Sequence, residues 1–138
     1  MGKVAILVDG GFYHKRANNL FGKKSPQDRA QELYNYCIRL AISFESDLYR
    51  IFYYDCKPSE KGVYHPLTQK MKFLKDSAQY KWSTEFQKEI VSKRKVALRL
   101  GELLDNNLSY SLRPEAIKKL CNRTITVDNL TYDDFKLN

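Results

Sequence analysis

Residues 4–11 read Val-Ala-Ile-Leu-Val-Asp-Gly-Gly, an apolar run that stops on a carboxylate and two glycines. Five consecutive apolar residues, three of them β-branched, are typical of a parallel strand buried on both faces, so we expect a central strand here. Glycines let the backbone turn sharply and let a ligand approach closely. Because the residues from Phe12 to Leu20 have helical character, the unit is predicted to be a strand, a turn and a helix.

Asp9 ends the apolar run, and we expect it at the carboxyl edge of the sheet. Ligands of open α/β sheets bind outside that edge, and an ionised carboxylate there is a natural ligand for a hard divalent cation. The alternative is structural, because an aspartate at this position can cap the helix that follows. These residues alone do not separate the two roles.

A second strand is predicted from Leu48 to Tyr54, where aromatic and β-branched residues are frequent, and it also ends on a carboxylate, Asp55. Before it, Ser25-Pro26 predicts the start of a helix that ends before Ser46. A strand–helix–strand order implies a right-handed crossover and parallel strands. If the strands are neighbours, Asp9 and Asp55 share one edge, where a metal or a phosphate could bind. Asp55 could instead hold its own turn.

The rest of the chain is expected to contain further helices and a final strand. A long helix is predicted from about Lys81 to Leu104, since apolar residues recur on one face at helical spacing. Its opposite face is basic, which indicates either a solvated surface or contact with phosphates. Shorter elements are expected as a helix around 67–74, a helix from 114 to 120, an extended piece at 124–127 and a strand at 135–138.

The composition favours an anionic partner. The 138 residues include 24 lysines and arginines against 16 aspartates and glutamates, which gives a net charge of +8 and favours nucleic acid over a membrane surface. Aromatic residues make up 13% of the chain and would suit stacking on single-stranded bases. The length indicates one domain, and no Walker-type loop, G-x-S-x-G elbow or zinc spacing occurs.

The three cysteines, Cys37, Cys56 and Cys121, are widely spaced and form neither a metal-ligand pattern nor a disulfide framework. This usage indicates the reducing cytoplasm. No apolar stretch approaches the length that spans a membrane.

Five segments, in order along the chain, resemble bacterial LabA-like proteins with an NYN domain. They are the strand and turn at 4–12, the second strand at 49–56, His-Pro-Leu-Thr at 65–68, the basic segment at 93–101 and Asp-Asp-Phe at 133–135. The resemblance implies an α/β fold of the Rossmann-like PIN type, a three-layer sandwich with a parallel sheet. It also implies metal-dependent cleavage of RNA, with acidic residues that bind Mg²⁺ or Mn²⁺. Asp9 matches the first acidic residue of that motif set.

The chain departs from the family at its C-terminal end. The family continues with a Gln-Lys-Gly-Val-Asp segment and a Gly-Asp-Ser-Asp segment, which supply further carboxylates and strands, and neither occurs here. We therefore expect residues 1–138 to form an NYN domain that lacks its C-terminal acidic motifs, as a shortened chain, a degenerate gene product or one piece of a split protein. Missing strands would leave an open sheet edge, so we expect a homo-oligomer or a C-terminal partner that completes the sheet.

Two functions compete at this point. In the first, the chain is a metal-dependent ribonuclease in which Asp9 holds Mg²⁺ or Mn²⁺ and Asp55 assists at the same edge. The candidate RNA contacts are Lys57, Arg94, Lys95 and Arg99. In the second, the chain is a non-catalytic RNA-binding or assembly module that keeps the fold without the full acidic site. The missing carboxylates favour the second function and the resemblance favours the first. A phosphatase with Asp9 as its nucleophile would need a second carboxylate close behind, which is absent.

Overall fold

The computed structural model describes residues 2–102, 105 and 107–138, and their contacts divide them into two compact units. Unit 1 contains the described residues of 1–58 and 78–103, and unit 2 contains those of 59–77 and 104–138. Helices alternate with strands in unit 1, which confirms the α/β class. That residues 1–138 belong to one incomplete NYN domain stays a prediction.

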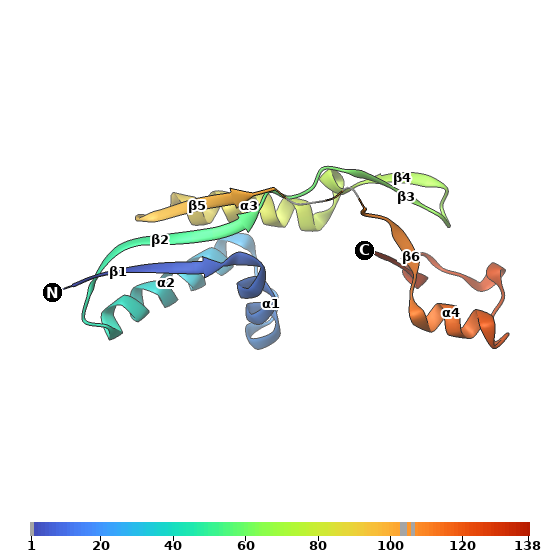
Figure 1. Ribbon diagram of the computed structural model, residues 1–138, viewed down its shortest axis with the longest axis horizontal. Helices are drawn as coiled ribbons and strands as arrows, with labels where there is room; N and C mark the ends of the chain where they lie inside the picture. Colours follow the sequence, from blue (N-terminus) through green and yellow to red (C-terminus); the bar gives the residue numbers. More distant parts are fainter. Residues whose placement is uncertain (1, 103–104, 106) are drawn as a thin grey trace. The chain divides into compact units, whose positions relative to one another are not determined.

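Unit 1 is built on a three-stranded parallel sheet with the strand order β1-β2-β5 (Figure 1). The strands are β1 (Lys3–Asp9), β2 (Asp47–Cys56) and β5 (Val96–Gly101). Ile6, Ile51 and Val96 lie side by side in the register, and each pair of strands is parallel. The strands predicted at 4–8 and 48–54 and their parallel arrangement are therefore confirmed.

β1 lies at the edge of this sheet, although the sequence predicts a central strand buried on both faces. Ile6 and Val8 are half-buried, whereas Leu7 between them is 65% exposed. The run is apolar on both faces, but among the described residues of unit 1 helices cover only one of them. The third layer of the expected sandwich therefore stays a prediction.

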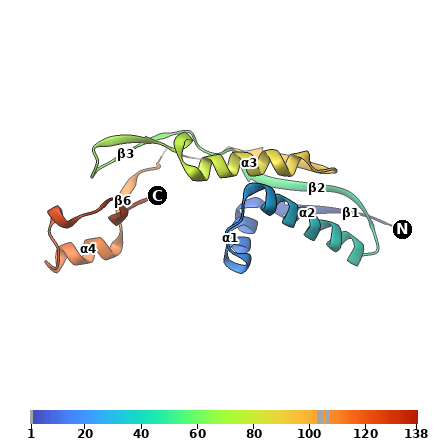
Figure 2. The ribbon, with the colours of Figure 1, turned by 180° about the vertical axis from the view of Figure 1, so that it is seen from behind.

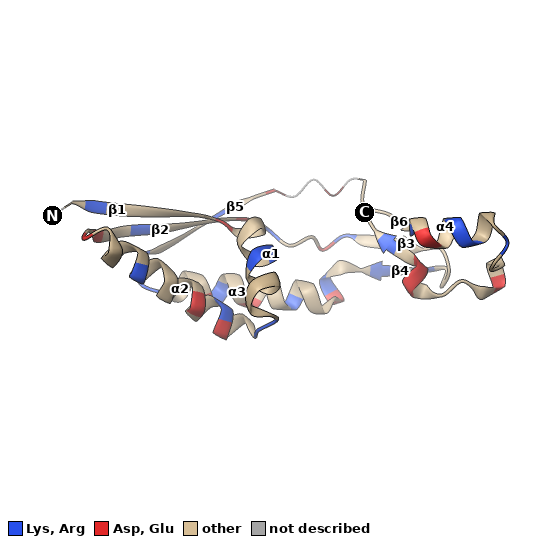
Figure 3. Ribbon diagram, turned by 90° about the horizontal axis from the view of Figure 1, so that it is seen from below, with Lys and Arg blue, Asp and Glu red and all other residues tan. Residues whose placement is uncertain are grey.

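The covering helices lie on one side of the sheet, behind the strands in Figure 1 and in front of them in Figure 2. Figure 3 shows the same layer from below. They are α1 (Gly10–Phe21), α2 (Pro26–Ser43) and α3 (Ala78–Ser92). The predicted start of α2 is confirmed, because the Ser25 hydroxyl accepts the Asp28 N–H and Pro26 is the first helical residue. Among the described residues, no helix has both the length and the apolar character needed to cross a membrane.

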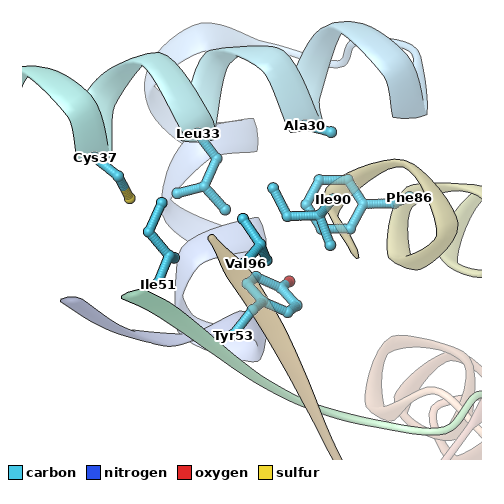
Figure 4. Packing of buried hydrophobic residues seen from close by; sticks show 8 residues of the cluster. All are labelled: Ala30, Leu33, Cys37, Ile51, Tyr53, Phe86, Ile90 and Val96. Carbon is cyan, nitrogen blue, oxygen red and sulfur yellow. The ribbon is translucent and has the colours of Figure 1, made fainter. Parts of the chain in front are cut away.

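The core of unit 1 lies between this helical layer and the sheet (Figure 4). Leu33 and Cys37 of α2 point toward Ile51 of β2, while Phe86 and Ile90 of α3 fill the space beside them. Cys37 is thus a buried hydrophobic side chain, and all three cysteines are free thiols.

The helix predicted from about Lys81 to Leu104 is confirmed as far as Ser92, within α3, and is wrong beyond that residue. α3 ends at Ser92, and the chain then turns through Lys95, whose φ of +67° is incompatible with a continuing helix, into β5. Residues 96–101 alternate between the two faces of the sheet, and this period of two is hidden because Ala97 and Leu100 also fit a helical stripe. Leu104 lies outside the described residues.

The described residues of unit 2 form two small antiparallel sheets, one short α-helix and three 3₁₀ turns. The elements are β3 (Gly62–His65) with β4 (Lys70–Phe73), β6 (Tyr110–Leu112) with β7 (Phe135–Leu137), and α4 (Pro114–Cys121). His65 is buried, and its ring stacks on Tyr132 with the ring centroids 4.0 Å apart.

Two short elements of unit 2 are confirmed and two are wrong. The helix predicted at 114–120 and the strand predicted at 135–138 correspond to α4 and β7. The helix expected around 67–74 is instead a turn, in which Gln69 adopts a φ of +57°, followed by β4 and a 3₁₀ turn. The piece expected to be extended at 124–127 forms bends that lead into a 3₁₀ turn, Val127–Asn129, which Thr126 caps.

Candidate functional site at the carboxyl edge of the sheet

The carboxyl ends of β1, β2 and β5 surround an open hollow of about 700 Å³. Asp9 and Asp55 both line it, together with Tyr54 and Arg99. Asp9, Tyr54 and Arg99 occupy the same level of the register, one on each strand. The two candidate carboxylates thus lie at the same end of the sheet, as the predicted strand–helix–strand order implies.

Asp9 has the structural role that the sequence left open. Its Oδ1 accepts the backbone N–H of Phe12 at 3.2 Å and caps the N-terminus of α1. The residue is nevertheless exposed and lines the hollow. Capping and cation binding are therefore compatible at this carboxylate.

Gly10 allows the start of α1 to pack tightly against β2. A Cβ atom at this position would lie 2.6 Å from Tyr53 Oη and 2.7 Å from the carbonyl oxygen of Tyr54. No real side chain fits at such distances, and the backbone atom cannot move aside. This close approach holds Asp9 beside the end of β2, where Asp55 lies.

Asp55 is held by its own strand end and by α3. Its Oδ1 accepts the N–H of the next residue, Cys56, at 2.8 Å. A turn held by the Asp55 side chain would need a bond to the N–H two residues further on, so the bond to Cys56 is of a different kind. Gln87, which is buried in α3, donates to Asp55 Oδ2 at 3.4 Å and to the Cys56 carbonyl at 3.1 Å.

A chain of polar contacts leads from His14 through Tyr53 to Asp55. His14 Nε2 lies 2.7 Å from Tyr53 Oη, and that oxygen lies 3.5 Å from Asp55 Oδ2. Burial lowers the pKa of His14, and the Asp55 charge only partly opposes this effect. Burial, followed by the Asp55 charge, raises the pKa of Tyr53. The chain therefore joins a neutral imidazole to a phenol that keeps its proton.

Neither His14 nor this chain of contacts was identified from the sequence. One indication was available. Gly10 and Ala17 are the buried residues of α1, and His14 falls between them at helical spacing, on the same face. A histidine on the buried face of a helix beside a candidate carboxylate is a candidate member of the site.

The lowered pKa of His14 gives a pH-dependent stability. The unfolded chain protonates His14 more readily than the folded chain does. The stabilisation of the folded chain by neutral, buried His14 is therefore complete above the ordinary pKa of 6.5 and is lost as the pH falls below it. Urea unfolding between pH 8 and pH 5 measures the effect, and we expect His14→Gln to weaken the pH dependence. An identical dependence in both proteins would contradict this assignment.

The four candidate RNA contacts do not lie together. Arg99 lines the hollow and Lys57 follows the end of β2, so these two share the edge with Asp9. Arg94 and Lys95 precede β5 and therefore lie at the amino-terminal ends of the strands. At the usual rise of a strand, Arg94 is about 16 Å from Arg99. The predicted helix would have placed Arg94, Lys95 and Arg99 near one face. In the structure, they are instead spread along β5 and the turn before it.

The residues that line the hollow offer two carboxylates to a metal ion. No group of three histidine, cysteine, aspartate or glutamate side chains able to hold a metal occurs in the described part of the chain. Magnesium in proteins commonly uses one or two carboxylates, with waters and phosphate oxygens as its other ligands. Two carboxylates are therefore enough in number for a single divalent cation and too few for a pair of cations.

Comparison of this chain with protein-family models, with curated proteins and with solved structures finds no match. The geometry of the hollow and the motifs of the sequence are thus the basis for assigning a function.

Proposed function

We propose that this chain is a metal-dependent ribonuclease domain of the NYN type, which hydrolyses phosphodiester bonds of single-stranded RNA in the cytoplasm. The observation that carries this proposal is the presence of Asp9 and Asp55 in one hollow at the carboxyl edge of a parallel sheet, where α/β proteins bind their ligands. Arg99 on the wall of that hollow supplies a positive charge for a phosphate.

In this proposal each residue at the edge has a separate task. Asp9 and Asp55 would hold Mg²⁺ or Mn²⁺, which lowers the pKa of a bound water and withdraws charge from the phosphodiester. Arg99 and Lys57 would bind phosphates near the cleaved bond. Arg94 and Lys95, at the other edge of the sheet, would contact RNA away from that bond.

The test is cleavage of an end-labelled single-stranded RNA by the whole chain in Mn²⁺, with EDTA as the metal-free control. We expect Asp9→Asn to cleave at least tenfold more slowly, because it loses the charge that holds the cation. Asparagine caps helices as well as aspartate does, so the fold should be preserved. Asp47→Asn is the matched control, since Asp47 is exposed at the opposite end of β2. Equal cleavage by Asp9→Asn and the unchanged chain would remove Asp9 from catalysis.

A second candidate is a non-catalytic RNA-binding or assembly module. It is favoured by the local partners of both carboxylates, since the N–H groups of Phe12 and Cys56 give Asp9 and Asp55 a structural role without a metal. This function predicts RNA binding that weakens with salt, with no cleavage and no response to EDTA or to Asp9→Asn.

We also propose that a second copy or a C-terminal partner adds a strand to the outer edge of β1. No strand pairs with that edge among the described residues. An apolar groove of about 600 Å³ runs beside it between α1 and α2, and the exposed rings of Phe12 and Phe21 line it. An added strand would pair the open edge and cover the groove.

A further inference from the structure

The face of the sheet opposite the helices carries aromatic and cationic side chains. Ile51 and Tyr53 of β2 point into the core, so the alternate residues Arg50, Phe52 and Tyr54 point to the other side. In the register, Leu7 lies beside Phe52, and Arg99 lies beside Tyr54. The described residues of unit 1 place no helix over this face, which is the one toward the viewer in Figure 1. We call it the open face.

Two tyrosine rings beside the half-buried Phe52 are accessible. Tyr54 is 45% exposed, and Tyr49, the extra residue where the pairing of β1 with β2 shifts register, is 53% exposed. Phe52 and Tyr54 lie one pleat apart, about 7 Å along the strand. Rings arranged in this way on a sheet can each stack on one base of a single strand.

Arginines accompany these rings. The Arg99 guanidinium lies 5.5 Å from the centroid of the Phe52 ring, and the Arg50 guanidinium lies 5.8 Å from that of Tyr49. A planar guanidinium can stack on a base as an aromatic ring does, and it also attracts phosphates. At the positions that the register assigns to this face there are three cations, Lys3, Arg50 and Arg99, and two carboxylates, Asp9 and Asp47. Asp47 lies beside Lys3 at the far end of the strands, so the part of the open face around Arg50 and Arg99 is the part that favours a polyanion.

We infer that the open face is a stacking platform for single-stranded RNA, in which Tyr54 and the Arg99 guanidinium, itself supported by the Phe52 ring, each stack on a base. This inference rests on the RNA partner of the proposed function, but it does not depend on cleavage. Because Asp9 and Arg99 share one level of the register at the end of the sheet, RNA bound on the platform leads into the hollow. Duplex RNA keeps its bases stacked on one another, so the platform selects single strands.

The experiment measures binding of a short fluorescent uridine oligonucleotide by anisotropy, with the whole chain in EDTA so that metal-dependent cleavage is absent. We expect Tyr54→Ala to bind roughly 5- to 150-fold more weakly, as the loss of one base–aromatic stack requires. Tyr54→Phe keeps the ring and should bind as the unchanged chain does. Arg99→Ala should also weaken binding. Phe44→Ala is the matched control, because Phe44 is an exposed ring of unit 1 at the end of α2.

Three results would overturn the inference. One is equal binding by Tyr54→Ala and the unchanged chain, and another is equal affinity for duplex and single-stranded RNA. The third is a dimer in sedimentation that Tyr54→Ala converts to a monomer, which would identify the open face as a protein interface, because Tyr54 lies on the central strand and away from the outer edge of β1. The proposed function fails separately. Asp9→Asn should still bind the oligonucleotide, and a chain that binds through Tyr54 without cleaving RNA would contradict the ribonuclease and leave the platform intact.

Discussion

Replacing Phe86 with alanine is expected to lower the free energy of unfolding by about 3–5 kcal/mol. The Phe86 ring is 0% exposed, stacks on Trp82 at 5.3 Å and lies 5.5 Å from the ring of Tyr53, so it joins α3 to β2 in the centre of the core. Alanine would remove these contacts and leave a cavity that the surrounding elements can fill only in part. Urea unfolding followed by far-ultraviolet circular dichroism measures the change.

The control for Phe86 is Phe44→Ala, because Phe44 is 64% exposed and has little packing to lose. Its free energy of unfolding should stay within about 0.5 kcal/mol of that of the unchanged chain. A third variant, Phe86→Leu, keeps most of the volume and should lose less than Phe86→Ala. Equal losses in Phe44→Ala and Phe86→Ala would contradict the core assigned to unit 1.

The sequence was sufficient to predict the parts of unit 1 that local patterns determine. Residues 4–8 and 48–54 are apolar runs of strand length, and a carboxylate follows each of them. To predict that Asp9 and Asp55 lie near each other, it was then enough to assume that the two strands are parallel neighbours. What the runs could not show is how many layers cover the sheet, because burial depends on elements far away in the chain. For this reason β1 was expected in the centre and lies at the edge.

The helix predicted at 81–104 fails beyond Ser92 for a different reason. The segment after Ser92 satisfies a helical stripe and a strand alternation at once, and local periodicity cannot choose between them. Pairing decides the outcome, because Ile51 to Cys56 of β2 offer a free edge to Val96–Gly101. In β5, Arg99 lies at the carboxyl ends of the strands and lines the hollow, whereas Arg94 lies before the amino-terminal end of the strand. Only one of these two predicted arginines therefore belongs to the site.

The polar chain beside Asp55 could not be predicted for a third reason. It joins His14 of α1 to Tyr53 and Asp55 of β2, and the Phe86 ring of α3 packs edge-on against the His14 ring, so three separate segments meet there. None of these residues has a partner at a diagnostic spacing in the sequence. Only the packing of both helices on one face of the sheet brings the imidazole to the phenol.

Replacing Arg29 with alanine is expected to lower the free energy of unfolding by about 3 kcal/mol. The side chain is 0% exposed, and its guanidinium donates to Glu32 at 2.6 Å, to Asn18 at 3.1 Å and to the Gly22 carbonyl. It thus ties the end of α1 to the start of α2. Hydrogen bonds made by a charged group each contribute about 1.5–3 kcal/mol, and removing one member of a buried ion pair costs about 3–5 kcal/mol. We take the lower end because Glu32 keeps its contact with Lys24.

The same variant should change the response to acid. Burial raises the pKa of Glu32, but hydrogen bonds from Lys24 and Arg29 outweigh that effect, and the net pKa is lowered below its ordinary value of 4.5. The ion pair therefore stabilises the folded chain fully above about pH 4.5, and this contribution is lost as the pH falls through the lowered pKa. Arg29→Ala should unfold with less dependence on pH in that range. Arg39→Ala, an exposed arginine of the same helix, should retain both the stability and the acid response of the unchanged chain. If the two variants lost the same stability, the buried arginine would have no special part in joining α1 to α2.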